Sequence, residues 1–193
     1  RHNTEGIFGF GNTGSVTGVT NLVSDAGVVA SDVTGVGTAR ARLAACEYGN
    51  DKGIFGFGYT TTDVSMSNLV SNAGVVATDV TGVGTARRYV SGCSYGGDKG
   101  IIGFGYDGSS YVGMTNLVSN AGVVATDVSA VGTARSGVGA CEYGGDKGIM
   151  GYGDASGSQT AVTNLVSNAG VVATDVTGVG TARAQTAACE YGG

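Results

Sequence analysis

The sequence predicts an all-β protein, a four-bladed β-propeller of four-stranded antiparallel blades. One observation is a repeated unit that ends in Thr-Ala-Arg, at Arg40, Arg87, Arg135 and Arg183, with spacings of 47, 48 and 48 residues. A second is that each unit divides into short apolar segments separated by Gly and Asn, without the three-to-four-residue periodicity of a helix. Repeats of roughly 40 to 50 residues with this content are typical of propeller blades.

The second unit shows the four expected strands most clearly. They cover residues 43–48, 53–58, 67–71 and 75–80, and tight turns at 49–52 and 72–74 join the first to the second and the third to the fourth. Gly and Asn in these turns can adopt the positive backbone angles that hairpins require. The fourth strand is rich in valine, and we expect it at the outer edge of the blade.

The composition supports a single domain covering residues 1–193. Glycine accounts for 38 of the 193 residues, proline is absent and charged residues are 13%, against roughly a quarter in an average domain. The blades are expected at 6–33 plus 184–191, 43–80, 90–128 and 138–176. In this arrangement the C-terminal strand completes the first blade and closes the ring, which protects the sheet edges.

The second strands predict how the blades pack. Strict alternation in Gly53-Ile54-Phe55-Gly56-Phe57-Gly58 places Phe55 and Phe57 on one face and glycine on the other. The bulky face of one blade could then pack on the glycine face of the next.

The residues Thr133–Ala140, Tyr143–Ile149 and Thr163–Leu165 contain an Arg-Ser start, an apolar strand, a Gly-Gly turn and a second strand in that order. This order resembles the kelch repeat, and the resemblance covers all four units. The very uniform units are also similar to repeat proteins of bacteriophages and marine microbes. The resemblance implies a propeller used for binding or assembly in an extracellular or virion-associated setting.

The charge and the motifs exclude several functions. A net charge of −5 with ten basic residues disfavours nucleic acid and anionic membrane as partners, and no apolar run is long enough to insert in a bilayer. The single histidine, His2, is near the terminus, so no Ser-His-Asp or Cys-His arrangement can form in the body. We therefore expect no enzyme activity and no cofactor.

Two segments vary freely between units. One is the loop between the second and third strands, and the other directly follows the repeated arginine. Because antiparallel strands reverse direction at each turn, both segments should emerge on the same side of the disc. A binding surface there would use aromatic, Arg and polar side chains, and the candidates are Tyr59, Asp63, Arg88, Tyr89, Asp107, Tyr111 and Gln159. The alternative is that these are surface loops that have simply diverged.

The four repeated arginines should form a structural ring around the axis, where each one pairs with an acid or a backbone carbonyl, since an unpaired buried guanidinium is costly. The acids that recur eight residues before them are the natural partners; these are Asp32, Asp79, Asp127 and Asp175.

Cysteine also recurs once in each unit, at Cys46, Cys93, Cys141 and Cys189. Four thiolates could bind zinc, but the spacing contains no Cys-x-x-Cys pair, and disulfides need closer Cα atoms than adjacent inner strands need offer. We expect no metal and interpret the cysteines as small buried apolar side chains.

Two functions remain open. The first is a non-catalytic recognition module that binds a glycan or protein on a cell or virion surface through the variable face. The alternative is a structural subunit that assembles with copies of itself, into a filament or ring, by exchange of the C-terminal strand.

Overall fold

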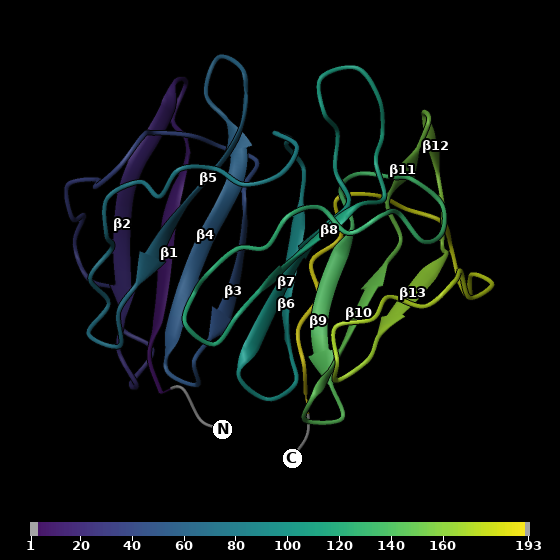
Figure 1. Cartoon of the computed structure of the whole chain (residues 1–193). Coiled ribbons are helices and arrows are strands. Elements are labelled where there is room, and N and C mark those ends of the chain that lie inside the picture. Colours follow the sequence, from purple (N-terminus) through teal and green to yellow (C-terminus); the bar gives the residue numbers. More distant parts are fainter. Residues whose placement is uncertain (1–3, 192–193) are drawn as a thin grey trace.

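A computed structural model describes residues 4–191, and within that range the regular structure consists of β-strands (Figure 1). The all-β prediction is confirmed. His2 lies outside the described residues. The strands are, in the first unit, β1 (Gly6–Asn12) and β2 (Val16–Val23); in the second, β3 (Ala44–Tyr48), β4 (Lys52–Tyr59) and β5 (Asp63–Val70); in the third, β6 (Ser91–Tyr95), β7 (Lys99–Gly103) and β8 (Thr115–Val118); and in the fourth, β9 (Gly139–Tyr143), β10 (Lys147–Gly151), β11 (Asp154–Ala155), β12 (Ser158–Gln159) and β13 (Thr163–Val166).

Each unit forms a small antiparallel sheet. The orders are β1-β2, β3-β4-β5, β6-β7-β8 and β9-β10-β13, with β11 and β12 as a separate hairpin. The expected fourth strand is present only as an extended segment, which in the second unit joins β5 through the bridges Ser67–Val80 and Val70–Val76. Its exposed valines lie at the outer edge, as predicted.

The four sheets follow one another in chain order across Figure 1. β3 packs against β6 and β7, and β6 packs against β9 and β10. Residues 184–191 form no strand; they begin beside β9, where the Gln185 amide donates to the Gly137 carbonyl at 2.7 Å. Among residues 4–191, β1 pairs with β2 alone, so the predicted completion of the first blade by 184–191 is not seen in the sheet pairing.

The predicted alternation in the second strand is wrong at its end. Phe57 adopts a left-handed backbone conformation with φ of 61°, and the β4–β5 register shifts between Gly56 and Gly58. This bulge turns Phe57 to the opposite side from Phe55. Phe55 therefore packs toward the first unit and Phe57 toward the third. Phe10, Phe104 and Tyr152 have the same φ sign at the matching positions.

The glycine faces do receive bulky side chains, as predicted. A Cβ atom at Gly56 would lie 2.7 Å from Cδ1 of Ile102, and one at Gly9 would lie 2.9 Å from the ring of Phe55. These approaches are shorter than real Cβ contacts, so a side chain at either glycine would push Ile102 or Phe55 out of place. Glycine inside these strands thus permits the close stacking of successive units.

A buried arginine lies at the centre of each internal junction. Arg87 has no exposed surface, and its Nε donates to the Phe104 carbonyl at 2.9 Å while Nη2 donates to Asn116 Oδ1 at 2.6 Å. Its guanidinium lies 4.2 Å from the centroid of Phe57. Burial lowers the pKa of Arg87 to about 10, and the charge of Asp127 opposes this change. The guanidinium therefore stays charged at neutral pH.

The acid partner comes from the next unit. Asp127 lies 3.7 Å from Nη1 of Arg87 and accepts from the amide and hydroxyl of Thr85 at 2.9 and 2.7 Å. Burial would raise the pKa of Asp127, but hydrogen bonds from Thr85 and Asn116 and the charge of Arg87 together lower it. We call this arrangement the clamp. It joins Thr38 and Arg40 to Asp79 in the same way, and at the last junction Thr133 donates to Asp175 while the charge of Arg135 acts on the same carboxylate.

Two expectations about the repeated residues need correction. The clamp pairs each arginine with the aspartate of the following unit, and not with the one eight residues before it. Arg183, expected in the same ring, is exposed, whereas the other three repeated arginines are fully buried.

The cysteines differ in the same way along the stack. Cys93 is buried as predicted, and burial raises its pKa to about 12; Cys46 and Cys141 are half-buried. Cys189 is exposed, so the expectation of a small buried side chain is wrong there.

Replacing Arg87 with Ala should lower the free energy of unfolding by about 3–5 kcal/mol, because it leaves Asn116 and two carbonyls unpaired in the junction. Arg183→Ala, at the exposed counterpart, should change it by less than about 0.5 kcal/mol. Urea unfolding at low protein concentration measures both. Equal effects of the two substitutions would contradict the clamp.

The clamp also predicts a pH dependence. Because the pKa values of Asp79, Asp127 and Asp175 are lowered in the folded state, their stabilisation is complete above the unfolded pKa and is lost as the pH falls below about 4. The triple Asp→Asn variant should be less stable at pH 7, by roughly 1 kcal/mol per site. Its stability should also fall less steeply than that of the wild type as the pH is lowered. Thermal unfolding against pH measures this. A triple variant that loses stability at acid pH as steeply as the wild type would refute the role of these aspartates.

Candidate binding surface

The variable segments meet at one end of the stack. The tips of the β1–β2, β4–β5 and β11–β12 hairpins point to the same end, at the top of Figure 1. Contacts join the two variable segments directly, since Arg88 lies 3.1 Å from Asp63 of the β4–β5 hairpin. The loop between the second and third strands and the segment after the repeated arginine are therefore in contact at this pair.

Arginine and tyrosine side chains alternate across this face, and we call this row the Arg–Tyr ladder. The Arg42 guanidinium lies 4.9 Å from the Tyr89 ring and 5.2 Å from the Tyr59 ring. Arg88 lies 4.8 Å from Tyr59 and 5.0 Å from Tyr106. These distances are within the range of cation–π attraction. The side chains of the ladder therefore connect the second and third units.

The ladder continues toward the fourth unit. Tyr106 and Tyr111 pack edge to face with centroids 5.4 Å apart. The Tyr111 hydroxyl hydrogen-bonds the carboxylate of Asp154, and desolvation together with the charge of Asp154 raises the pKa of Tyr111. Tyr111 is therefore held as a neutral donor at the end of the row.

A second row lies beside the ladder, and we call it the axial row. It consists of the second residue after each repeated arginine; these residues are Arg42, Tyr89, Gly137 and Gln185, with φ of 59°, 55°, 60° and 55°. Their backbones are joined in sequence, Tyr89 N to Arg42 O at 2.9 Å, Gly137 N to Tyr89 O at 3.2 Å and Gln185 N to Gly137 O at 2.7 Å. All four line a shallow hollow of about 500 Å³.

The left-handed conformation suits glycine, and the third unit has glycine there. For other residues it costs on the order of 1 kcal/mol. The other three units nevertheless carry Arg, Tyr or Gln, whose long side chains border the hollow. Backbone strain of this kind is concentrated at functional sites.

The structure brings together most of the residues that the sequence predicted. Tyr59, Asp63, Arg88 and Tyr89 lie in or against the ladder, and Tyr111 ends it. Asp107 instead caps its own turn, accepting from the amides of Ser109 and Ser110 at 2.9 and 2.7 Å. Gln159 is exposed on β12, opposite Asp154 in the hairpin, and no ring or charge contact joins it to the ladder among residues 4–191.

Sequence reasoning missed three members. Arg42, Tyr106 and Asp154 all lie in the variable segments, but nothing in the sequence distinguished them from their neighbours. Strand pairing is the signal that could have identified Arg42 and Tyr106. Arg42 belongs to the segment that pairs with Tyr59, and Tyr106 pairs with Arg88. Arg88 and Tyr106 are hydrogen-bonded partners in the backbone, at 2.9 Å in both directions.

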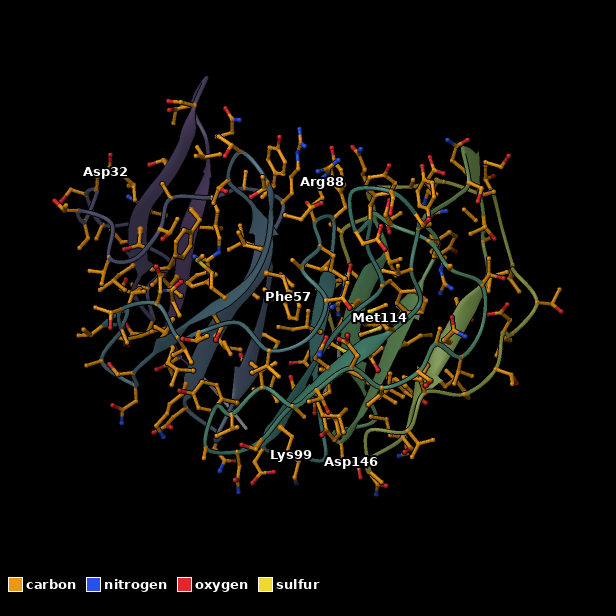
Figure 2. All side chains as sticks on the ribbon, turned by 45° about the horizontal axis from the view of Figure 1, so that its top comes forward. Asp32, Phe57, Arg88, Lys99, Met114 and Asp146 are labelled. Atoms are coloured by element: carbon orange, nitrogen blue, oxygen red, sulfur yellow. The ribbon has the colours of Figure 1, made fainter. Side chains whose placement is uncertain are left out.

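The turns that hardly vary between units lie at the other end, marked by Lys99 and Asp146 in Figure 2, away from Arg88. Asp51 accepts from Lys52 at 2.9 Å and from Asn72 at 3.1 Å, and the matching residues of the fourth unit, Asp146, Lys147 and Asn168, form the same bonds. These contacts tie the two invariant turns of a unit together, so their uniformity has a structural cause.

No group of three or more His, Cys, Asp or Glu side chains able to hold a metal ion occurs in the range 4–191. Within the same part of the chain, no helix is long and apolar enough to cross a membrane. No protein-family model matches the chain, and no curated protein is significantly similar to it.

The Arg88–Asp63 pair should show a coupling energy of roughly 1 kcal/mol in a double-mutant cycle of Arg88→Ala and Asp63→Ala, because both side chains are largely shielded from solvent. The exposed Lys147–Asp146 pair, measured the same way, should give a coupling near zero. Chemical unfolding of the variants supplies these values. Equal coupling of the two pairs would show that the ladder does not shield its charges.

Proposed function

We propose that this chain is a non-catalytic recognition module, with its units arranged as propeller blades, that binds a glycan on a cell or virion surface through the Arg–Tyr ladder and the axial row. The observation that carries the proposal is the axial row. Three units hold long side chains in a backbone conformation that favours glycine, and all of these side chains border one hollow.

The chemistry of this surface suits a sugar. Tyrosine rings can pack on the apolar faces of pyranose rings, and guanidinium groups donate several hydrogen bonds in a fixed geometry to hydroxyl or carboxylate oxygens. Arg42 is exposed while Tyr59, Tyr89, Tyr106 and Tyr111 are half-buried, so the guanidinium is accessible and the rings are already ordered. Preordered rings reduce the entropic cost of binding. A protein epitope would use the same groups and is the second source of ligand to test.

The strained positions allow a test that separates binding from folding. Arg42→Gly and Tyr89→Gly should each change stability by no more than about 1 kcal/mol, because relief of the positive φ offsets the loss of the cation–π contacts. Both should reduce ligand binding by about tenfold or more, since each removes an anchor of the site. A glycan array identifies the ligand, and titration calorimetry with that glycan measures the affinities.

Gln159→Ala, on the same end but outside the ladder, is the matched control and should bind as the wild type does. Binding that survives both glycine substitutions would place the ligand elsewhere. An array with neutral and acidic sugars that shows no binding to the folded wild-type protein would refute the glycan proposal.

A further inference from the structure

The interfaces between successive units are built from complementary halves, and the two ends of the stack expose one half each. At the internal junctions Thr and Arg of one unit clamp the Asp of the next. At the end of the fourth unit, Arg183 stacks 4.0 Å from Tyr152 and donates to the Thr181 carbonyl at 3.1 Å. No aspartate from another unit contacts it within residues 4–191.

The receiving half of the clamp is exposed at the opposite end. Asp32 of the first unit accepts from Asn21 at 2.8 Å, as Asp127 accepts from Asn116 at 2.9 Å. In residues 4–191 no threonine or arginine of another unit reaches Asp32. The donor half at Arg183 and the acceptor half at Asp32 thus match each other.

The apolar contacts divide in the same way. Phe8 is 63% exposed, whereas its counterparts Phe55, Ile102 and Met150 are buried, the last two against Gly56 and Gly103 of the preceding unit. Gly151 offers the same glycine surface at the far end of the stack. Its nearest neighbours come from its own unit, at Thr163 and Val162.

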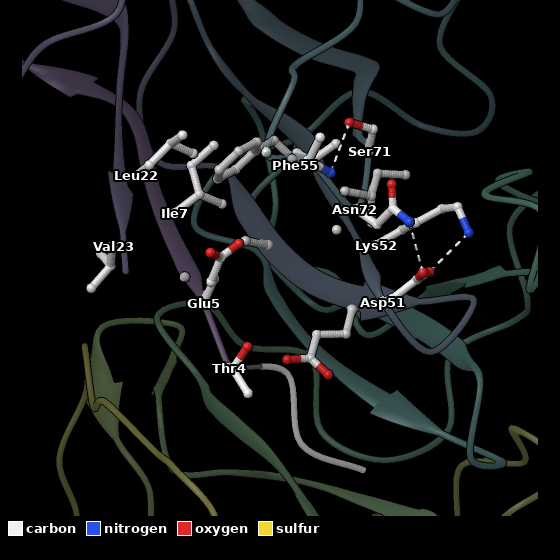
Figure 3. Close-up of a pocket in the computed structure, with 18 of the residues that line it drawn as sticks. Thr4, Glu5, Ile7, Leu22, Val23, Asp51, Lys52, Phe55, Ser71 and Asn72 are labelled. Atoms are coloured by element: carbon white, nitrogen blue, oxygen red, sulfur yellow. Dashed lines mark hydrogen bonds and ion pairs between the residues drawn. The ribbon is translucent and has the colours of Figure 1, made fainter. Parts of the chain in front are cut away.

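A cavity of about 910 Å³ lies between the β1–β2 sheet and the β3–β4–β5 sheet (Figure 3). Ile7 and Leu22 line one side, and Phe55 and Lys52 line the other. The cavity also includes Gly53 and Gly74, and the corresponding positions at the next junction are filled. There Cys46 Sγ lies 2.6 Å from the Cβ position of Gly100, and the Tyr48 ring lies 2.9 Å from that of Gly122. The cavity therefore has the lining that elsewhere holds an Ala-Ala-Cys-Glu-Tyr strand.

The chain contains a second, exposed copy of that strand. Residues Ala187–Tyr191 have the same sequence as β3, Ala44–Tyr48. Tyr191 is 96% exposed, whereas Tyr48 is 4% exposed. The open edge of β1 and the exposed segment lie on different units and share no hydrogen bond among residues 4–191. β2 and β13 are at opposite sides of the stack in Figure 1.

We propose that this chain assembles head to tail, with Ala187–Tyr191 of one copy entering the cavity of a second copy and pairing antiparallel with its β1. The register of β3 on β4, with Cys46 opposite Ile54, places Cys189 opposite Ile7. The same contact brings Arg183 and Thr181 of the first copy to Asp32 of the second. It also packs Phe8 of the second copy on Gly151 of the first. Because the two surfaces differ and belong to the first and last units, the contact is heterologous and can add further copies in succession.

Charge substitutions at the two halves test the assembly. The wild-type chain should form oligomers that grow with concentration in size-exclusion chromatography with light scattering. Arg183→Asp and Asp32→Arg should each stay monomeric, with association weakened by about a hundredfold or more. An equimolar mixture of the two variants should assemble again, because the native Arg183–Asp32 contact can form between unlike variants and their two substituted ends carry opposite charges. Ser109→Arg, at an exposed loop tip, is the control and should assemble like the wild type.

A wild-type chain that stays monomeric at every concentration, or single variants that assemble normally, would overturn the proposal. Circular dichroism confirms that each variant is folded. Glycan binding by the monomeric variants is measured separately, so failure of the assembly and failure of the proposed recognition function give different results.

A disulfide distinguishes a second copy from closure within one chain. Gly53 corresponds to Gly100, which meets Cys46 at the next junction. A Gly53→Cys thiol should therefore lie beside Cys189 of the entering strand, and oxidation should link the two. Non-reducing electrophoresis should show a ladder of multiples of the chain, and adding Cys189→Ser should abolish it. A disulfide confined to single chains would show that the segment closes on its own first unit and would overturn assembly between copies.

Discussion

The structure depends on burying a charged arginine between two units. A guanidinium removed from water is tolerated only when its donors are satisfied and a counter-charge is near. Arg87 meets both conditions through the Phe104 carbonyl, Asn116 and Asp127. Since these groups belong to the following unit, no unit can form this contact alone. Stability therefore resides in the junctions, as in other repeat proteins.

The same junction explains the unusual backbone of the second strands. Phe57 must turn toward the third unit to lie under Arg87, and a left-handed residue with a bulge achieves this. Glycines then accept the bulky residue of the next unit. With the turns fixed by Asp–Asn contacts at one end, the loops at the other end can vary without disturbing the stack. This separation leaves one face free for the recognition function that we propose.

Much of the fold could be predicted from the sequence because it depends on local patterns. The period, the first two strands of each unit and the turns follow from residue types and spacing. The side on which Phe57 lies could not be predicted, because the alternation rule assumes an extended backbone and Phe57 leaves it. The partner of Arg40 was misassigned for a related reason, since Asp32 and Asp79 are equivalent in sequence and only the stacking direction selects Asp79. Arg88 and Asp63 were predicted because they lie in variable loops. Arg42 was missed because the rings that it contacts come from two other segments.

The most direct test of the junction is hydrogen exchange at the arginine Nε–H groups, followed by NMR in the Asp32→Arg variant, which is expected to be monomeric. The structure predicts slow exchange at Arg40, Arg87 and Arg135, whose Nε–H groups donate to carbonyls in the next unit, and fast exchange at the exposed Arg183. Fast exchange at all four arginines would contradict an account in which buried guanidinium groups hold the units together.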